Sequence, residues 1–597
     1  MVNRIDPELA LRMVRESPII AFDTETSGLT VKDAICGYVV TDADNSIYVP
    51  VRHEGGGNVP NVEEFERELR VAFQDRTRLG HHTVGHHLGF DLRAALRHGI
   101  QITGSCEDTM INESLCNDLT VGYGLDDCAP RWGVQAKKGA EIYQLLASRF
   151  GGIPDRKQMG KFWKLEGDNP VVVDYATGDG ISTLQLRNAQ QKKLDEMELR
   201  KVWKLECDLL PYLARMHNRG MLIDMAYADK VNADIAAAIG EMSKKFTPGF
   251  NARSPKEVEA LYRANGYTDS MFDRTEKGAV SFTEGWLETN EIGDAILSIR
   301  RLEKARDSFV SPLIDTNNVN GRVHPVLHQS KSDDYGVAGA RLSCSEPNLQ
   351  AIPKRRIEIG RIVRRLVIPD PGMLIEEADA KQQEPRLFTH YSEDKALLYG
   401  YRTGEFDMHD RANEVLGLND REKAKRLGMG MLTMMSVKTL SMHMRCKLDE
   451  ADYLHNRFLR EAFPAIKELQ DTAIIRYRSR GYIKSILGRR AHCDSPRFAY
   501  RGVSRLIQNS GGDHIKTCML RACQYEDAHP DDIQMLLSIH DSMLWQRRPD
   551  FDSSELVKVL EDVATEFELK VPIPFEVGSG TDWARASYGS KLDKFQE

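Results

Sequence analysis

The stretch GMLIEEADAKQQEPRL, residues 372–387, joins an apolar strand pattern to a helical pattern and leaves Asp379 at the junction. A second stretch, QMLLSIHDSMLWQ at 534–546, has two apolar arms with His540 and Asp541 at the bend, which predicts a β-hairpin. Either aspartate alone is more simply a turn-forming residue. If the two strand ends meet after folding, their carboxylates can share a pair of metal ions.

A helix with a cationic stripe is predicted between these two stretches. In REKAKRLGMGMLTMMSVKTL (421–440), four side chains recur every four residues and share one slowly drifting face: Arg421, Lys425, Met429 and Thr433. Arginine grips phosphate oxygens with two hydrogen bonds, and lysine adds a point charge. Beside a carboxylate pair the stripe suits a triphosphate, whereas by itself it would be a solvated basic face.

A separate pair of carboxylates is predicted near the N-terminus. In PIIAFDTETSGL (18–29), an apolar strand carries Asp23 and Glu25 at i and i+2, so both side chains point to the same face. Two carboxylates on one face can share a cation.

Three more side chains complete this N-terminal set. Asp91 begins a helical pattern, and Tyr175 and Asp179 lie one helical turn apart. Four carboxylates could hold two hard divalent cations that activate water for phosphodiester hydrolysis, with the phenol orienting that water.

Length and composition indicate a multi-domain globular protein. The chain has 597 residues, 41% hydrophobic and 28% charged, and we find no apolar run long enough to span a membrane. The ten scattered cysteines are expected to be reduced. The net charge of -8 argues against binding nucleic acid by charge alone, although one segment is a candidate phosphate-binding surface: Lys354, Arg355, Arg356, Arg361, Arg364 and Arg365.

Six segments resemble, in order, the motifs of family A DNA polymerases: RLSCSEPNLQAIP (341–353), ADAKQQEPRLFTHYSED (378–394), REKAKRLGMGMLTMMS (421–436), GYIKSILGRR (481–490), QNSGGDHIK (508–516) and SIHDSM (538–543). The N-terminal carboxylates resemble those of the DEDDy 3′-5′ exonucleases, which stand ahead of the polymerase in this family. Because 22 residues precede Asp23, we expect no 5′ nuclease domain, as in compact phage-type members.

The resemblance implies an α/β and α+β multi-domain fold, with an RNase H-like exonuclease domain before a right-hand polymerase. The expected limits are the exonuclease domain at 1–190, palm base and helical thumb at 191–315, palm at 316–395 and 480–597, and fingers at 396–479. A long helical pattern after residue 181 is expected to end at Gly220, which acts as its C-cap.

By the same resemblance, the polymerase site binds two Mg²⁺, or Mn²⁺, through Asp379, Asp541 and the Ala380 carbonyl. Residues expected at the deoxynucleoside triphosphate are Arg421, Lys425, Met429, Thr433, His409, Gln382 and Glu384, the last blocking a ribose 2′ hydroxyl. Residues expected at the primer-template DNA are Arg341, Gln508, Arg386, His540, Asn348, Gln350 and Arg490.

The second metal pair is expected in the exonuclease site. Its ligands would be Asp23, Glu25, Asp91 and Asp179, and Tyr175 would position the attacking water.

The chain departs from the family pattern at several positions. Met429 and Thr433 replace two aromatic residues, Ser542 replaces a glutamate, and His87 replaces an asparagine. Pro385 replaces a leucine and requires a place in the first turn of its helix. Gly339 and Ala340 stand for the usual Thr-Gly.

Together these patterns predict a replicative phage DNA polymerase that proofreads, works in the host cytoplasm and does not bind membranes. Three other classes are alternatives: an exonuclease whose C-terminal half only clamps DNA, a single-subunit RNA polymerase, and an architectural DNA-binding protein. Replisome partners such as a helicase, a single-strand binding protein or a processivity factor are not specified by the sequence.

Overall fold

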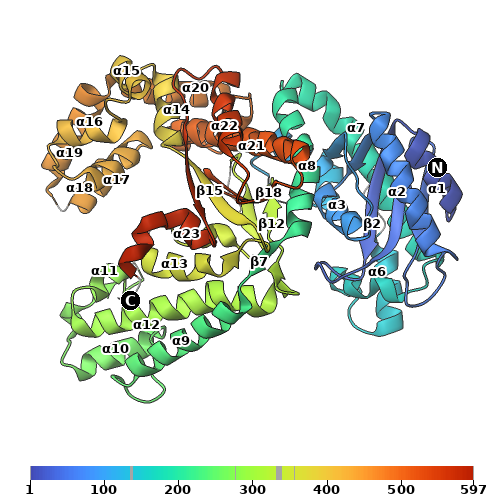
Figure 1. The fold of residues 1–597 in the computed structure, drawn as a ribbon, viewed down its shortest axis with the longest axis horizontal. Coiled ribbons are helices and arrows are strands. Elements are labelled where there is room, and N and C mark those ends of the chain that lie inside the picture. The colour runs from blue at the N-terminus through green and yellow to red at the C-terminus, as the bar shows by residue number, and fades with distance from the viewer. Residues whose placement is uncertain are drawn as a thin grey trace.

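The computed structural model describes residues 2–595 except for these positions: 121, 135–138, 276, 331–338, 355 and 445. Figure 1 shows an N-terminal unit on the right, a sheet at the centre, and two groups of helices on the left. All ten cysteines are free thiols, as the sequence predicts.

The N-terminal unit is built on a six-stranded sheet in the order β1-β4-β3-β2-β5-β6. Its strands are β1 (Val2–Arg4), β2 (Ile19–Thr26), β3 (Ile35–Thr41), β4 (Asn45–Pro50), β5 (His82–Gly85) and β6 (Cys106–Asp108). Strand β2 pairs antiparallel with β3 and parallel with β5, so it lies inside the sheet.

Helices cover both faces of this sheet. One core joins β2 and β3 to α1 (Pro7–Glu16), α2 (Val62–Arg78) and α3 (Leu88–Arg97). A second core joins β3 and β4 to α6 (Gly139–Phe150) and α7 (Pro170–Glu196). Side chains of β2 that belong to neither core can therefore take part in a site on this sheet.

The predicted long helix after residue 181 is two helices rather than one. Helix α7 ends at Glu196, and α8 (Arg200–Arg219) begins after a break in which Glu198 has φ 58°. The left-handed backbone at Glu198 ends the run of α-helical hydrogen bonds. Gly220 caps α8 with φ 63°, as predicted.

Two groups of helices flank the central sheet (Figure 1). The lower group contains α9 (Met225–Ser243), α10 (Pro255–Ala264) and α12 (Glu291–Ala305). The upper group contains α15 (Lys395–Thr403), α16 (Met408–Leu416), α17 (Arg421–Leu432), α18 (Val437–Met444), α19 (Leu448–Arg457) and α20 (Pro464–Arg480). The helices of the upper group form a helical block over residues 395–480.

The central sheet has the order β18-β19-β15-β20. Its strands are β15 (Leu374–Ala380), β18 (Ile533–Ile539), β19 (Ser542–Arg547) and β20 (Phe575–Gly580). β18 and β19 form the predicted hairpin, with a two-residue turn at His540 and Asp541. β15 lies between β19 and β20, so the strand that carries Asp379 near its end lies directly beside this hairpin.

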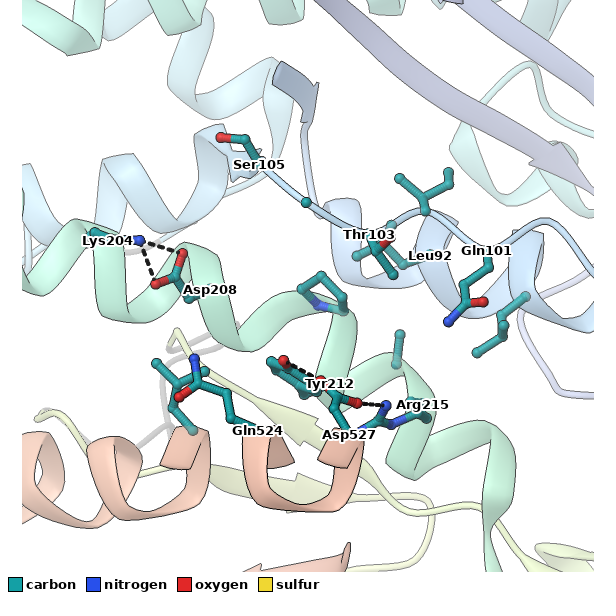
Figure 2. A pocket seen from close by; sticks show the side chains of 16 residues that line it. Leu92, Gln101, Thr103, Ser105, Lys204, Asp208, Tyr212, Arg215, Gln524 and Asp527 are labelled. Carbon is teal, nitrogen blue, oxygen red and sulfur yellow. Dashed lines mark hydrogen bonds and ion pairs between the residues drawn. The ribbon is translucent and has the colours of Figure 1, made fainter. Parts of the chain in front are cut away.

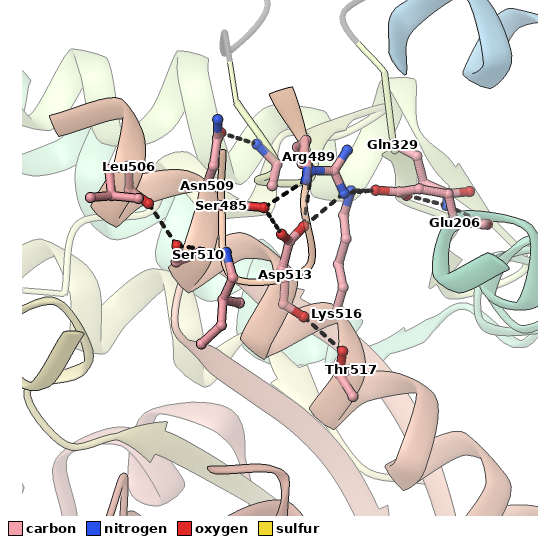
Figure 3. Close-up of polar contacts among 12 residues, drawn as sticks. Glu206, Gln329, Ser485, Arg489, Leu506, Asn509, Ser510, Asp513, Lys516 and Thr517 are labelled. Atoms are coloured by element: carbon pink, nitrogen blue, oxygen red, sulfur yellow. Dashed lines mark hydrogen bonds and ion pairs between the residues drawn. The ribbon is translucent and has the colours of Figure 1, made fainter. Parts of the chain in front are cut away.

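A buried ionic cluster joins α8 to the central region (Figure 3). Glu206 on α8 accepts a hydrogen bond from Lys516 Nζ at 2.6 Å and also pairs with Arg489. Arg489 Nε donates to Asp513 at 2.9 Å. Lys516 and Asp513 lie on α21 (Gly502–Ala528) and are fully buried. Because buried charges are costly unless paired, this cluster fixes α8 against α21.

Candidate active sites

The N-terminal site is formed by three carboxylates that the structure brings together as predicted. One oxygen each of Asp23, Glu25 and Asp179 lies within 4.8 Å of the others. Asp23 and Glu25 are on β2, and Asp179 is on α7, which packs across that sheet. Several carboxylate oxygens at this spacing suit a hard divalent cation.

Asp91, the fourth predicted ligand, lies beside this group. It is 2% exposed in the first turn of α3, and its Oδ1 accepts hydrogen bonds from Thr24 N at 2.9 Å and Thr24 Oγ1 at 2.7 Å. Burial, and next the charge of Asp23, raise the pKa of Asp91 well above its usual value. A cation would relieve this repulsion. The sequence analysis did not identify Thr24 as the residue that holds Asp91.

Tyr175 and Asp179 lie one turn apart on α7, as the sequence predicts. Tyr175 is 7% exposed and its ring packs on Phe162 with a centroid distance of 5.7 Å. This packing limits the positions that the phenol can adopt.

His87 is the cap residue of α3 and has φ 64°. Asparagine adopts this left-handed backbone more readily than most residues, which gives a physical reason for the asparagine that the family places here. Burial, and next Arg93, lower the pKa of His87 to about 4, so its ring is neutral at physiological pH.

The central-sheet site is formed by Asp379 and Asp541, which lie at adjacent strand ends. Asp379 is opposite Ser542 in the β15–β19 register, and Ala380 N donates to the Asp541 carbonyl oxygen at 3.0 Å. Burial, and next the charge of Asp379, raise the pKa of Asp541 to about 6. The two residues that the sequence separates by a whole helical block are therefore electrostatic neighbours.

Ser542 contributes directly to this site. Its Oγ donates to Asp379 Oδ2 at 2.8 Å. The serine that replaces the family's glutamate therefore orients Asp379.

Lys354 and Glu377 also belong to the site, and sequence reasoning missed both roles. Lys354 Nζ lies 2.7 Å from Asp379 Oδ2 and 2.8 Å from Glu377 Oε1. Although burial raises the pKa of Glu377, Arg364 and Lys354 together hold it below its usual value. The i and i+2 positions of Glu377 and Asp379 on β15 could have indicated this shared face.

The prediction that Arg364 belongs to a basic phosphate-binding surface is wrong. That side chain is 1% exposed, donates to Glu377 Oε2 at 3.0 Å, and stacks 4.3 Å from the Trp583 ring centroid. Arg356 is exposed but pairs with Glu284 at 2.9 Å. Arg355 lies outside the described residues.

The cationic stripe lies on α17 as predicted, and Arg421 has acidic partners. Arg421 Nε donates to Asp410 Oδ1 at 2.7 Å, and its Nη2 donates to Asp407 Oδ2. Asp407 Oδ2 also accepts from Gln382 Nε2 at 2.5 Å. Gln382 is three residues after Asp379, so this chain of contacts links the stripe to the central-sheet site.

The other residues predicted at the triphosphate lie on the same helices. His409 on α16 is 2% exposed, and burial lowers its pKa. Lys425 is partly exposed on α17. Met429 packs against the core of the helical block, and Thr433 Oγ1 donates to the Met429 carbonyl at 2.9 Å.

Glu384 and Arg341, predicted respectively at the sugar and at the DNA, are in contact. Arg341 Nη2 donates to Glu384 Oε1 at 2.5 Å. Pro385 is the third residue of α14 (Gln383–Ser392), which confirms its expected place in the first turn.

The position of Arg386 does not suit the direct DNA contact that the resemblance implies. It is 7% exposed, and its guanidinium donates to the Lys381 and Pro572 carbonyls at 3.0 and 2.7 Å. This burial disfavours a contact with the primer end. Arg386 instead fixes the loop that follows Asp379.

Of the remaining predicted DNA contacts, His540 and Gln350 lie at the hairpin, whereas Gln508 and Arg490 lie on other elements. His540 is exposed in the turn with φ 56°, and Gln350 Nε2 donates to the Ser538 carbonyl at 3.0 Å. Asn348 begins the short helix Leu349–Ala351. Gln508 is partly exposed on α21, and Arg490 lies 4.3 Å from the Tyr482 ring centroid.

A pocket of about 660 Å³ lies away from both sites (Figure 2). It is lined by α3, α8, α21 and the segment 101–105, at the junction of the N-terminal unit with the rest of the chain. Its charged side chains pair with one another: Lys204 with Asp208, and Arg215 and Tyr212 with Asp527. The contacts of Asp527 join α21 to α8, whereas the Lys204–Asp208 pair lies within α8.

Comparisons with known proteins agree with this division of the chain. The family model described as DNA polymerase family A matches residues 225–585, and the one described as 3′-5′ exonuclease matches residues 3–195. The helices in the described part of the chain include none with the length and apolar character of a bilayer span.

Curated relatives match along most of the chain. DNA polymerase DpoZ of Acinetobacter phage SH-Ab 15497 is 27% identical, covering 95% of this chain and 96% of that protein. DNA polymerase I of Rhizobium leguminosarum is 28% identical over 96% of this chain and 59% of its own length. The solved POL domain of Pol1 from M. smegmatis, in complex with DNA primer-template and dNTP, aligns with a TM-score of 0.81 at 20% identity and covers 98% of this chain and 100% of that one.

Proposed function

The chain belongs to DNA polymerase family A and carries a 3′-5′ exonuclease domain, and we propose that its two carboxylate sites catalyse two different reactions on DNA. The central-sheet site extends a primer strand, and the N-terminal site trims the same strand. Both classes of domain depend on divalent metal ions. We propose that each site binds two Mg²⁺.

In synthesis, Asp379, Asp541 and the Ala380 carbonyl would hold the cations. When bound, these cations lower the pKa of the primer 3′ hydroxyl and offset charge on the transferring phosphoryl group. The primer oxygen forms a bond to the α-phosphorus, the bond to the bridging oxygen of the β-phosphate breaks, and pyrophosphate leaves.

The substrate contacts follow from the positions of the remaining residues. Arg421, Lys425 and His409 would bind the triphosphate, and for this purpose Arg421 has to release Asp407 and Asp410. Glu384 would fill the space of a ribose 2′ hydroxyl. Residues proposed along the incoming nucleotide and DNA are Gln382, Met429, Thr433, Arg341, Gln508, His540, Asn348, Gln350 and Arg490.

In trimming, Asp23, Glu25, Asp91 and Asp179 would hold the second pair of cations, and Tyr175 would orient the attacking water. The water oxygen bonds to phosphorus, and the bond to the 3′ oxygen of the preceding nucleotide breaks. The raised pKa of Asp91, caused first by burial and next by the charge of Asp23, supports this assignment because a bound cation would favour the ionised carboxylate.

The proposed partners are primer-template DNA and deoxynucleoside triphosphates. The solved relative was bound to a DNA primer-template and dNTP. The expected limits at 190, 315, 395 and 479 are retained as proposed boundaries of the exonuclease domain, thumb, palm and fingers. Because phage polymerases are among the relatives, we also propose a replicative role in the host cytoplasm.

The hydrogen bond between Ala380 N and the Asp541 carbonyl carries the synthesis proposal, since it brings the two carboxylates to one place. The test is primer extension with Mg²⁺ on matched and mismatched primer ends. Asp379→Ala should abolish extension and retain trimming. Asp23→Ala should retain extension and lose trimming by about a hundredfold or more, because a metal ligand is removed.

The results of these assays also distinguish the proposed polymerase from the three alternative classes of protein. Trimming without any extension in the unmodified protein would indicate an exonuclease that only clamps DNA. Faster incorporation of ribonucleotides than of deoxynucleotides would indicate an RNA polymerase. DNA binding without any metal-dependent turnover would indicate an architectural protein.

A further inference from the structure

Lys354 makes a contact that the proposed reaction does not use. Its Nζ lies 2.7 Å from Asp379 Oδ2, the carboxylate proposed to bind metal, and 2.8 Å from Glu377 Oε1. Ser542 donates to the same Asp379 oxygen. In the free protein this oxygen therefore already has a cationic partner and a hydrogen-bond donor.

Glu377 keeps the lysine at this place. It is 3% exposed, and its other oxygen, Oε2, accepts from Arg364 Nη1 and Trp583 Nε1, each at 3.0 Å. If Lys354 leaves Asp379, the Glu377 contact still holds its ammonium group within a few ångströms of the site. Lys354 thus keeps its contact with the buried Glu377, while its contact with Asp379 can be replaced, because the Asp379 side chain is 37% exposed.

We propose that Lys354 is a positioning residue of the polymerase site, holding Asp379 Oδ2 in the free enzyme until a divalent cation displaces it. The inference rests on the proposed metal site at Asp379 and Asp541. Lys354 then sets the metal concentration at which synthesis begins, because the cation has to compete with the ammonium group for this oxygen.

The test measures Mn²⁺ binding to the full-length protein by electron paramagnetic resonance. Asp23→Ala and Asp179→Ala are introduced together so that the remaining signal comes from the central-sheet site. In that background, Lys354→Met should bind Mn²⁺ about fivefold more tightly, the factor that corresponds to losing a partly exposed ion pair worth about 1 kcal/mol. The magnesium concentration for half-maximal primer extension should fall in parallel.

The matched control is Lys381→Met. Lys381 Nζ lies 2.9 Å from Glu576 Oε1, and its side chain is 47% exposed against 40% for Lys354. It is two residues from Asp379 but pairs with another carboxylate, so the loss of this charge should change Mn²⁺ binding far less. Lys354→Arg keeps the charge and should bind Mn²⁺ no more tightly than the unmodified protein.

The possible failures are distinguishable. If Asp379→Ala removes the Mn²⁺ signal but Lys354→Met leaves the affinity unchanged or weaker, the inference about Lys354 is wrong and the metal site stands. If Lys354→Met does not fold, tighter binding by Lys354→Arg would still contradict the inference. If Asp379→Ala leaves the signal intact, the proposed polymerase site itself is wrong.

Discussion

At Asp541, burial and the charge of Asp379 act in the same direction and raise the pKa to about 6. The folded protein therefore binds this proton more tightly than the unfolded chain does. As the pH rises from the usual pKa of the group to about 6, the metal-free protein loses stability that it has in acid. A bound cation would reverse this trend, because it favours the ionised form.

We expect Asp541→Asn to remove this pH dependence. In the presence of a chelator, the melting temperature of the variant should rise relative to that of the unmodified protein as the pH increases from about 4 to about 7. Thermal unfolding followed by circular dichroism measures the difference. A difference that stays constant over this range would show that Asp541 titrates normally.

Glu384 should determine sugar selectivity. We expect Glu384→Ala to improve ribonucleotide incorporation relative to deoxynucleotides by about tenfold or more, because space opens where the 2′ hydroxyl would clash. Single-nucleotide incorporation kinetics measure the ratio. Glu393→Ala, an exposed change at the end of the same helix, is the control, and an equal ratio in both variants would contradict the role of Glu384.

For single residues, the sequence predicted which side chains belong to the sites better than it predicted which side chains contact one another. Spacing paired Asp23 with Glu25 on β2 and Tyr175 with Asp179 on α7, and the resemblance to the DEDDy exonucleases joined the two pairs into the carboxylate group that the structure has. The contacts of Lys354 with Asp379 and of Arg341 with Glu384 were not predictable. Each joins residues that are distant along the chain, and no local periodicity encodes such a pairing.

Helix α17 shows how an element would hold the proposed triphosphate contact before the substrate binds. Asp407 and Asp410, both near the start of α16, hold Arg421 in place. A triphosphate carries more negative charge than these two carboxylates, so it can take over the guanidinium group. The acids therefore pre-orient Arg421 without blocking it.

We expect Arg421→Ala to raise the KM for deoxynucleoside triphosphates by about tenfold, since one charge-assisted contact is lost. Steady-state primer extension measures this change. Arg426→Ala, an exposed arginine on the same helix, provides the control. A KM that rises equally in both variants would indicate a general charge effect rather than a specific contact.

The periodicity of α17 and the hairpin at Asp541 were predicted correctly because each follows a local pattern, a four-residue repeat in the helix and two apolar arms around a bend in the hairpin. The break between α7 and α8 was not predicted. Residues 197–199 carry no glycine or proline, and the chain turns there because α7 packs on the N-terminal sheet while α8 packs on α3 and α21. Tertiary packing decided that boundary.

On the scale of the whole molecule, α8 connects the two catalytic regions. Trp203 Nε1 donates to Asn112 in the N-terminal unit at 2.9 Å, and Asn218 Nδ2 donates to the Arg93 carbonyl at 3.0 Å. On its other side, Glu206 enters the buried cluster with Arg489 and Lys516. The overall fold class predicted from the resemblance is confirmed by the solved relative.

We expect Glu206→Gln to lower the free energy of unfolding by about 3 kcal/mol, because two buried cations would then share Asp513 as their remaining acid. Urea denaturation measures the loss. Glu198→Gln breaks the exposed pair between Glu198 and Lys484 and should have little effect. Equal destabilisation by both changes would show that the buried cluster contributes no more than a surface pair.

The position of α8 also has a consequence for how a misincorporated nucleotide is removed. Because α8 contacts the exonuclease domain along one side and is held by buried charges along the other, swinging that domain toward the central-sheet site would have to break both sets of contacts. If the two sites act on one primer as proposed, we therefore expect the unpaired primer end to move to the trimming site, and the time that it spends single-stranded to set how often an error is removed.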